Sequence, residues 1–131
     1  METGMRRLVI ALATLAAFSG AALADFLPFD QAKFEALVKS NAPVVVHTHE
    51  SWCPVCRVQS DILERLQKDP KLSKVTMFRA HPANDRKALE PLKVTSRSII
   101  LVFAGGKEVG RLNWITDEAS IRLVIEMAAE E

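Results

Sequence analysis

Two cysteines, Cys53 and Cys56, are the residues best suited to chemistry in this sequence of 131 residues. They are its only cysteines, and Pro54 and Val55 lie between them. A disulfide across so short a loop removes little entropy from the unfolded chain, so a purely structural role explains the pair poorly. Such a pair is typical of thiol-disulfide exchange, in which one thiolate attacks a disulfide and a second thiol resolves the mixed disulfide.

The flanking sequence predicts that this pair lies at the start of a helix. Before it, the run from Val44 to His49 is rich in β-branched residues and indicates a strand buried on both faces, the central strand of a sheet. After it, apolar residues recur at helical spacing to about Lys68. These are Val58, Ile62, Leu63 and Leu66. Pro54 suits the first helical position, where its missing N–H costs nothing.

A helix N-terminus would divide the work between the two sulfurs. The free N–H groups and the helix dipole favour an anion there, so the pKa of Cys53 should be lowered and Cys53 should be the attacking sulfur. Cys56 lies almost one helical turn further on, close enough to attack a mixed disulfide at Cys53. We expect Cys56 to be the more buried of the two.

The remaining segments predict an α/β fold. Asp30 can cap a helix over residues 31–39, and Asp117 can cap the final helix. Between them we expect strands over residues 75–80, 98–104 and 107–113, a short helix over 84–92 limited by Pro91, and a hairpin turn at Gly105-Gly106. The apolar residues of the final helix are Ile121, Leu123, Val124, Ile125 and Met127, which we expect to form its buried face. This order predicts a central mixed β-sheet flanked by helices on both faces.

The first 24 residues read as a signal peptide. Arg6-Arg7 precede an apolar run from Leu8 to Phe18, and small residues at positions 22 and 24 form a cleavage site before Asp25. The run is short of the ~20 apolar residues that span a bilayer, so we expect no stable membrane span after cleavage, although an uncleaved anchor would share the same pattern. We therefore expect a signal peptide over residues 1–24, one domain over residues 25–131 and a periplasmic protein, in a compartment where disulfides persist.

The charge balance excludes some classes of partner. The full chain has a formal net charge of +1, and loss of Glu2, Arg6 and Arg7 with the signal would leave a net charge of zero. A neutral domain gives no electrostatic reason to bind nucleic acid or an anionic membrane.

The residues together resemble the thioredoxin superfamily. The stretch Trp52-Cys53-Pro54-Val55-Cys56, the Val-rich strand before it, the Phe103-Ala104-Gly105-Gly106 turn and the closing amphipathic helix follow the thioredoxin order over residues 26–129. The resemblance implies a thioredoxin fold and a thiol-disulfide oxidoreductase without a cofactor. It also implies protein thiols or disulfides as substrates and a redox partner that recycles the pair.

Two positions depart from the thioredoxin pattern. His47 stands where the family has a buried Asp, so it could act as the general base for Cys56, or it could be a neutral core histidine bound to a backbone carbonyl. Ser98 stands where the family has a cis-proline, and a cis peptide before serine would cost ~2.5 to 4 kcal/mol. The loop that ends in Arg97 and Ser98 should still face the cysteines. With Trp52, these two residues are the candidate substrate-binding residues.

Two other functions remain open at this point. Cys53, Cys56 and the histidines are ligand types that copper or zinc accepts, and the loss of the cis-proline would expose the sulfurs to metal. Alternatively, the domain could be a non-catalytic binding module with an inert disulfide. The dipeptide Pro54-Val55 differs from the Gly-Pro of thioredoxin and does not decide between reductase, oxidase and isomerase.

Overall fold

The computed structural model describes residues 25–131, so the predicted signal peptide lies outside the described residues. Its centre is one five-stranded sheet with the strand order β1-β3-β2-β4-β5. The strands are β1 (Leu27–Pro28), β2 (Val44–Thr48), β3 (Thr76–Ala80), β4 (Ile99–Ala104) and β5 (Lys107–Asn113). Strands β1 and β2 pair with β3 in parallel, whereas β4 runs antiparallel to both β2 and β5. The predicted mixed sheet is confirmed.

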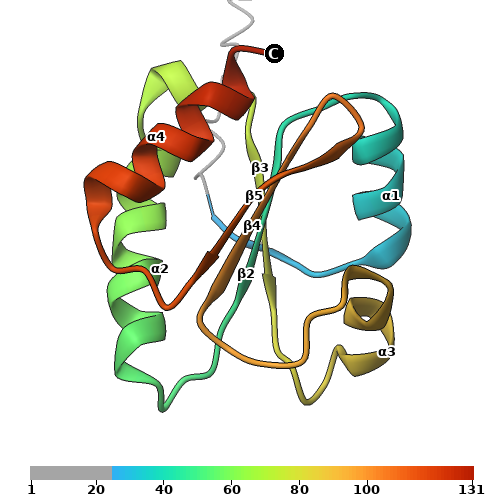
Figure 1. The fold of residues 1–131 in the computed structure, drawn as a ribbon, viewed down its shortest axis with the longest axis vertical. Coiled ribbons are helices and arrows are strands. Elements are labelled where there is room, and N and C mark those ends of the chain that lie inside the picture. The colour runs from blue at the N-terminus through green and yellow to red at the C-terminus, as the bar shows by residue number, and fades with distance from the viewer. Residues whose placement is uncertain (1–24) are drawn as a thin grey trace, which may run out of the picture.

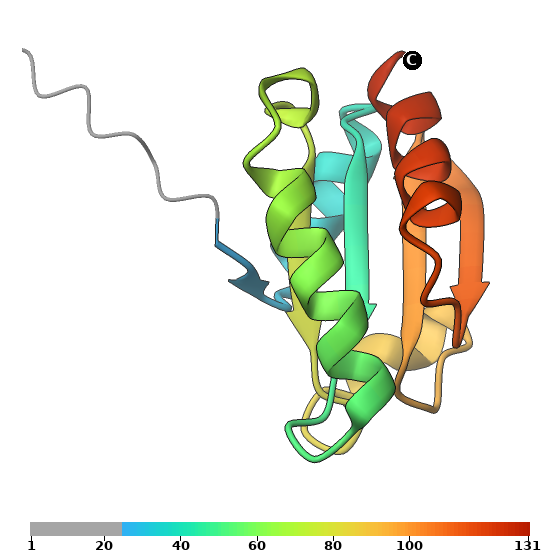
Figure 2. The same ribbon diagram turned by 90° about the vertical axis from the view of Figure 1, so that its left-hand side faces the viewer.

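Helices cover both faces of this sheet (Figure 1). Helices α2 (Pro54–Gln67) and α4 (Glu118–Ala129) lie side by side on one face (Figure 2). Helices α1 (Gln31–Lys39) and α3 (Arg86–Leu89) cover the other face. Short 3-10 turns follow α2 at Pro70–Leu72 (η1) and α3 at Glu90–Leu92 (η2). Each face of the sheet has its own apolar core, so the sheet separates two packed layers.

Strand β2 is the central strand that the β-branched run predicts. All five of its residues are buried. Side chains alternate between the two faces of a strand, so Val45 joins the core under α2 and α4 while Val44 and Val46 join the core under α1. His47 shares the face of Val45 and therefore points into the layer that holds α2.

Local chemistry explains where most elements begin and end. Asp30 and Asp117 cap α1 and α4 by accepting hydrogen bonds from backbone N–H groups, as predicted. Gly105 and Gly106 both have positive φ, 59° and 81°, which the two-residue hairpin between β4 and β5 requires. The predicted helix over residues 84–92 is shorter, because Pro91 lies in the 3-10 turn that follows α3. Strand β1 was not predicted, since two residues carry no periodicity.

The expected apolar faces of α2 and α4 were wrong in detail. Val58 is 45% exposed, and the polar Gln59 next to it is fully buried. On α4, Leu123 and Met127 are 59% and 61% exposed, so the buried face of this helix is narrower than expected. Its buried residues are Ile121, Ile125 and Ala128.

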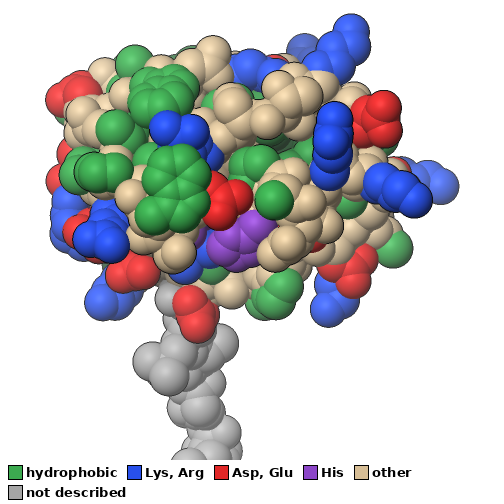
Figure 3. All heavy atoms as spheres, turned by 90° about the horizontal axis from the view of Figure 1, so that it is seen from below, with side chains coloured by type: hydrophobic (Ala, Val, Ile, Leu, Met, Phe, Trp, Pro, Cys, Tyr) green, Lys and Arg blue, Asp and Glu red, His purple; other side chains and the backbone are tan. Residues whose placement is uncertain are grey.

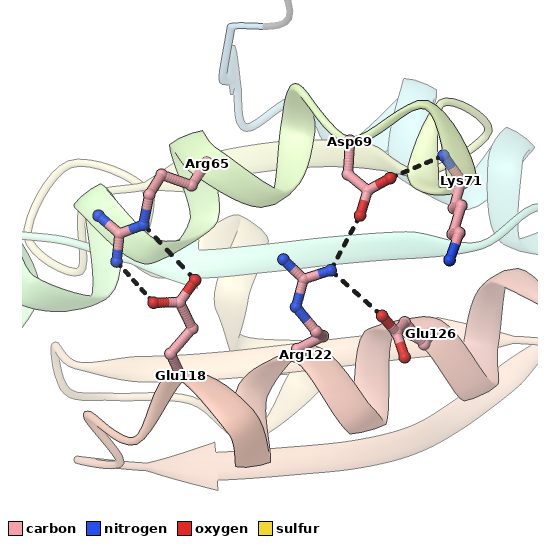
Figure 4. Close-up of polar contacts among 6 residues, drawn as sticks. All are labelled: Arg65, Asp69, Lys71, Glu118, Arg122 and Glu126. Atoms are coloured by element: carbon pink, nitrogen blue, oxygen red, sulfur yellow. Dashed lines mark hydrogen bonds and ion pairs between the residues drawn. The ribbon is translucent and has the colours of Figure 1, made fainter.

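Ion pairs join α4 to α2 and to the segment that follows α2 (Figure 4). Arg65 of α2 pairs with Glu118 at 2.9 Å, and Arg122 of α4 pairs with Asp69 at 2.9 Å. Arg122 also pairs with Glu126 at 3.2 Å. Exposed pairs of this kind add little to stability. Within residues 25–131, no helix is long and apolar enough to cross a bilayer.

Candidate active site

Cys53 stands at the first turn of α2, where the sequence places it. The chain leaves β2 at Thr48, turns, and enters the helix with Cys53 as its N-cap and Pro54 at the first helical position. The Cys53 sulfur accepts a hydrogen bond from the Cys56 backbone N–H at 3.2 Å. The sulfur therefore does at this helix what a carboxylate does at an ordinary N-cap.

The Ser98 hydroxyl lies between the two sulfurs. Its Oγ is 3.2 Å from the Cys53 sulfur and 3.1 Å from the Cys56 sulfur, and both cysteines are free thiols. Both are covered from solvent, but Cys53 lies just below the surface and Cys56 lies deeper, as expected for an attacking and a resolving thiol. Ser98 is itself fully buried. No peptide bond in residues 25–131 is cis, and Ser98 has a φ of 63°.

The two thiols differ in acidity. Burial raises the pKa of Cys53, but hydrogen bonds from Cys56 and Ser98 and the nearby Arg97 guanidinium outweigh burial and bring this pKa from 9.0 to about 7. Burial also raises the pKa of Cys56, and the neighbouring Cys53 sulfur raises it further. A single negative charge on the pair is therefore more stable on Cys53 than on Cys56, while the attacking and resolving roles stay a prediction.

His47 is held by a buried amide. The Gln59 side-chain NH₂ donates to the backbone oxygens of Ser98 and Ile115, at 3.2 and 3.0 Å, so its Oε1 must accept. His47 Nε2 lies 3.0 Å from this Oε1 and is therefore the protonated nitrogen of a neutral ring. Burial lowers the pKa of His47 from 6.5 to about 3. Its partner is thus a side chain rather than the backbone carbonyl of our alternative.

The role of His47 as a general base stays a prediction. Among the described residues, its hydrogen-bond partner is Gln59, and no hydrogen bond joins it to Cys53 or Cys56. The ring connects to the cysteines only indirectly, because Gln59 also binds the carbonyl of Ser98.

The three histidine rings lie next to one another in a row. The His49 ring centroid lies 5.5 Å from that of His47 and 6.2 Å from that of His81. Burial, followed by the nearby Arg79 charge, lowers the pKa of His49. In residues 25–131, no three or more His, Cys, Asp or Glu side chains converge as metal ligands would. The copper or zinc hypothesis therefore gains no support from residues 25–131.

A cationic side chain lies between two tryptophans beside the cysteines. The Arg97 guanidinium stacks 4.4 Å from the Trp52 ring and 5.0 Å from the Trp114 ring. Trp52 is 62% and Trp114 47% exposed. Figure 3 shows this end of the molecule, where large hydrophobic side chains gather with a basic side chain between them. The structure thus brings the predicted residues Trp52 and Arg97 together at the surface, whereas the side chain of Ser98 is buried beneath.

A groove of about 590 Å³ opens beside this surface. Trp52, Ser96 and Arg97 contribute to its lining, together with Glu50 from the loop after β2 and Arg86 from the start of α3. The groove therefore carries both signs of charge and one exposed aromatic ring, which suits a peptide better than an apolar small molecule.

Sequence reasoning missed three residues of the site. Gln59 was hidden because a polar residue in an apolar helical stripe reads as an exposed one, although its spacing of three from Cys56 places both on one face. Trp114 lies far from the cysteines in sequence and reaches them because its N–H donates to the Ser98 oxygen at 2.9 Å. Thr48 accepts the Ser98 N–H at 2.9 Å, a contact visible only once β2 and β4 pair.

A buried central strand followed by two cysteines on the first turn of a helix, inside a mixed sheet covered on both faces, defines a protein of the thioredoxin fold. The family comparison agrees, because the thioredoxin family profile matches residues 25–127. The chain belongs to the thioredoxin family and is a thiol-disulfide oxidoreductase.

Solved structures support the same assignment. Trxlp from Edwardsiella tarda is 28% identical, with a TM-score of 0.71 over 75% of this chain and 95% of that one. A thioredoxin mutant from Halobacterium salinarum has a TM-score of 0.71 at 18% identity, over 85% of this chain and 96% of that one. The oxidised thioredoxin from Plasmodium falciparum has a TM-score of 0.66 at 20% identity, over 80% and 99% of the two chains. The last two show the fold alone.

Proposed function

We propose that Cys53 and Cys56 are the redox pair of an exported reductase that exchanges disulfides with protein substrates. The observation that carries this proposal is the asymmetry of two adjacent thiols. Hydrogen bonds lower the pKa of Cys53 to about 7, while burial raises the pKa of Cys56. Near neutral pH, half of Cys53 is a thiolate with Cys56 still protonated beside it, which is the state that attacks and then resolves.

The reaction has two exchange steps. The Cys53 thiolate attacks one sulfur of a substrate disulfide, which breaks that bond, releases one substrate thiolate and forms a mixed disulfide. The Cys56 sulfur then attacks Cys53, which releases the second substrate sulfur and leaves the Cys53–Cys56 disulfide. A redox partner must reduce this disulfide before the next turnover.

The surface next to the pair supports a protein as substrate. Trp52 and Trp114 expose aromatic area around Arg97, and the groove beside them carries Glu50 and Arg86. Aromatic and arginine side chains dominate protein-binding surfaces. The role of Trp52 and Arg97 in substrate binding is part of this proposal.

Two considerations support the direction and the compartment. A pKa near that of thioredoxin, about 7, stabilises the thiolate far less than that of a strong oxidant, about 3.5, so a reducing pair is expected. The features of residues 1–24 that read as a signal peptide support a periplasmic location.

Two measurements test the proposal. Reduction of insulin disulfides by the purified chain, with Cys53→Ser as the inactive control, tests the reaction. Equilibration with glutathione tests the direction: a reduction potential near about −270 mV supports a reductase, whereas one near about −120 mV would replace it with an oxidase. An active chain whose Cys53→Ser variant is equally active would exclude this redox pair.

A further inference from the structure

The position of the Ser98 side chain is not explained by a role in substrate binding. Its side chain is fully buried, and its Oγ contacts the Cys53 and Cys56 sulfurs at 3.2 and 3.1 Å. A hydroxyl both donates and accepts hydrogen bonds, so it can connect two thiols in a way that no apolar side chain can.

The backbone holds this hydroxyl in place. The Ser98 N–H donates to the Thr48 oxygen at 2.9 Å, and the Ser98 carbonyl accepts from the Trp114 N–H at 2.9 Å and from Gln59 Nε2 at 3.2 Å. The φ of 63° is one that residues other than glycine rarely adopt. Such strain persists only where the surroundings enforce it, and it gathers at functional positions.

Counting donors gives the hydrogen bonds a direction. The Cys53 thiolate can only accept, and it receives the Cys56 backbone N–H and the single hydroxyl proton of Ser98. The Ser98 oxygen is then free to accept the thiol proton of Cys56. The Thr48 carbonyl is a more distant acceptor for that thiol, at 3.9 Å, and has no proton to pass on. The Cys53 sulfur also accepts from the Cys56 side chain, but it is the atom that Cys56 attacks in the resolving step.

We propose that the Ser98 hydroxyl is a proton relay from the Cys56 thiol to the substrate sulfur that leaves Cys53. This inference rests on the redox pair proposed above. In the resolving step, Cys56 gives its proton to Ser98 Oγ while Ser98 gives its own proton to the departing sulfur. The Cys56–Cys53 bond forms as the bond between Cys53 and the substrate breaks. The substrate leaves as a neutral thiol, Ser98 is a hydroxyl again, and the substrate disulfide is the only oxidant.

The relay places Ser98 among the catalytic residues, because the departing sulfur is bonded to the atom that its hydroxyl already contacts. His47 is arranged differently, since its protonated nitrogen is occupied by Gln59. In this scheme, Gln59 is a positioning residue that fixes the Ser98 backbone, and His47 fixes Gln59.

The test uses the dependence of the resolving step on the leaving thiol. An alkyl thiolate is a poor leaving group and needs a proton, whereas an aromatic thiolate leaves without one. The purified chain is reacted in single turnovers with an alkyl disulfide peptide and with an aromatic disulfide, and the first-order decay of each mixed disulfide is followed. The variant is Ser98→Ala, and the control is Ser73→Ala, an exposed serine at the end of η1 that belongs neither to the cysteine site nor to the groove.

We expect Ser98→Ala to slow resolution of the alkyl mixed disulfide by about 100-fold, the usual size of general acid–base catalysis, and to change the aromatic one much less. Ser73→Ala should change neither. Equal slowing of both, or of neither, would overturn the relay while leaving the redox pair intact. Failure of the unmodified chain to form a Cys53–Cys56 disulfide with either probe would instead overturn the redox pair.

A second measurement covers the case in which Ser98→Ala does not fold. In the unmodified chain, resolution of the alkyl mixed disulfide should show a solvent deuterium isotope effect that the aromatic one lacks, because only the former transfers protons in its slow step. An equal isotope effect on both, or on neither, would contradict the relay.

Discussion

Helices α2 and α4 begin with the same kind of N-cap, but the two caps have different properties. They run in the same direction on one face of the sheet (Figure 2). At each start, an N-cap side chain accepts the backbone N–H three residues on: Cys53 accepts from Cys56 at 3.2 Å, and Asp117 accepts from Ser120 at 3.0 Å. Both helix ends therefore favour an anion.

The difference lies in what surrounds each cap. Asp117 is exposed, and its pKa is lowered by the Ser120 side chain and N–H. Cys53 is covered, contacts the buried Ser98 hydroxyl and lies above a buried polar network of Gln59 and His47. A helix N-terminus alone makes a stable cap. At Cys53, hydrogen bonds from Cys56 and from the Ser98 hydroxyl outweigh burial and turn the same cap into a reactive group.

The largest difference between the two caps should be in how the loss of each one changes activity. Cys53→Ser removes the attacking thiolate, so insulin reduction should fall to the uncatalysed rate. Serine is itself a favourable N-cap, so the melting temperature of the reduced protein should change little. A large loss of stability would mean that Cys53 is mainly structural.

The polar network below α2 should appear in the pH dependence of stability. The pKa of His47 is lowered from 6.5 to about 3, so its contribution is present above pH 6.5 and is lost as the pH falls toward 3. The slope should approach about 1.4 kcal/mol per pH unit in that window. Urea unfolding of the unmodified chain and of His47→Leu measures it. The variant should lack this part of the slope, and identical slopes would contradict a neutral buried ring.

A cysteine moved to the second cap isolates the contribution of the helix end. In a chain that carries Cys53→Ser and Cys56→Ser, the change Asp117→Cys places a thiol at the N-cap of α4 without a buried hydroxyl or a second thiol beside it. Its pKa should lie at least about one unit above that of Cys53. Alkylation rate against pH measures both thiols. Equal pKa values would mean that the helix end is sufficient and the buried network is not needed.

The smallest expected effect comes from removing the N-cap of α4. Asp117→Ala removes an acceptor at the start of α4 and should lower the melting temperature by roughly 5 °C. Activity per folded molecule should be unchanged, because α4 contributes no residue that contacts the sulfurs. Asp117→Asn, which keeps an acceptor, is the control and should recover most of the stability. A drop in activity with Asp117→Ala would mean that the start of α4 contributes to the activity of the cysteine pair.

The elements and the cysteine pair were predictable because their signals are local. The cap at Asp30, the run of β2 and the strand-to-helix setting of Cys53 each depend on a few neighbouring residues. The network around the pair was not predictable in the same way. Gln59 lies one turn after Cys56, but its partners Ser98 and Ile115 come within reach, as Trp114 does, only through the pairing of β2, β4 and β5, which periodicity does not describe.

The errors on the helix faces have a related cause. The buried face of a helix is predicted from its apolar residues alone. Yet Val58 and Leu123 are exposed while Gln59 is buried. A polar side chain that satisfies its hydrogen bonds can occupy a core position. Ser98 was placed correctly opposite the cysteines by its position in the family pattern. Its role could not be inferred until both sulfurs were seen at hydrogen-bond distance from its hydroxyl.

The pH at which Cys53 ionises in the reduced protein tests the central claim most directly. Alkylation by iodoacetamide, localised to residue 53 by mass spectrometry and followed against pH, reports the thiolate fraction at that sulfur. The asymmetric pair predicts a half-maximal rate at a pH of about 7 for Cys53, with the transition of Cys56 at a higher pH than that of an ordinary cysteine because burial raises its pKa. A single transition near 9.0 shared by both thiols would contradict it.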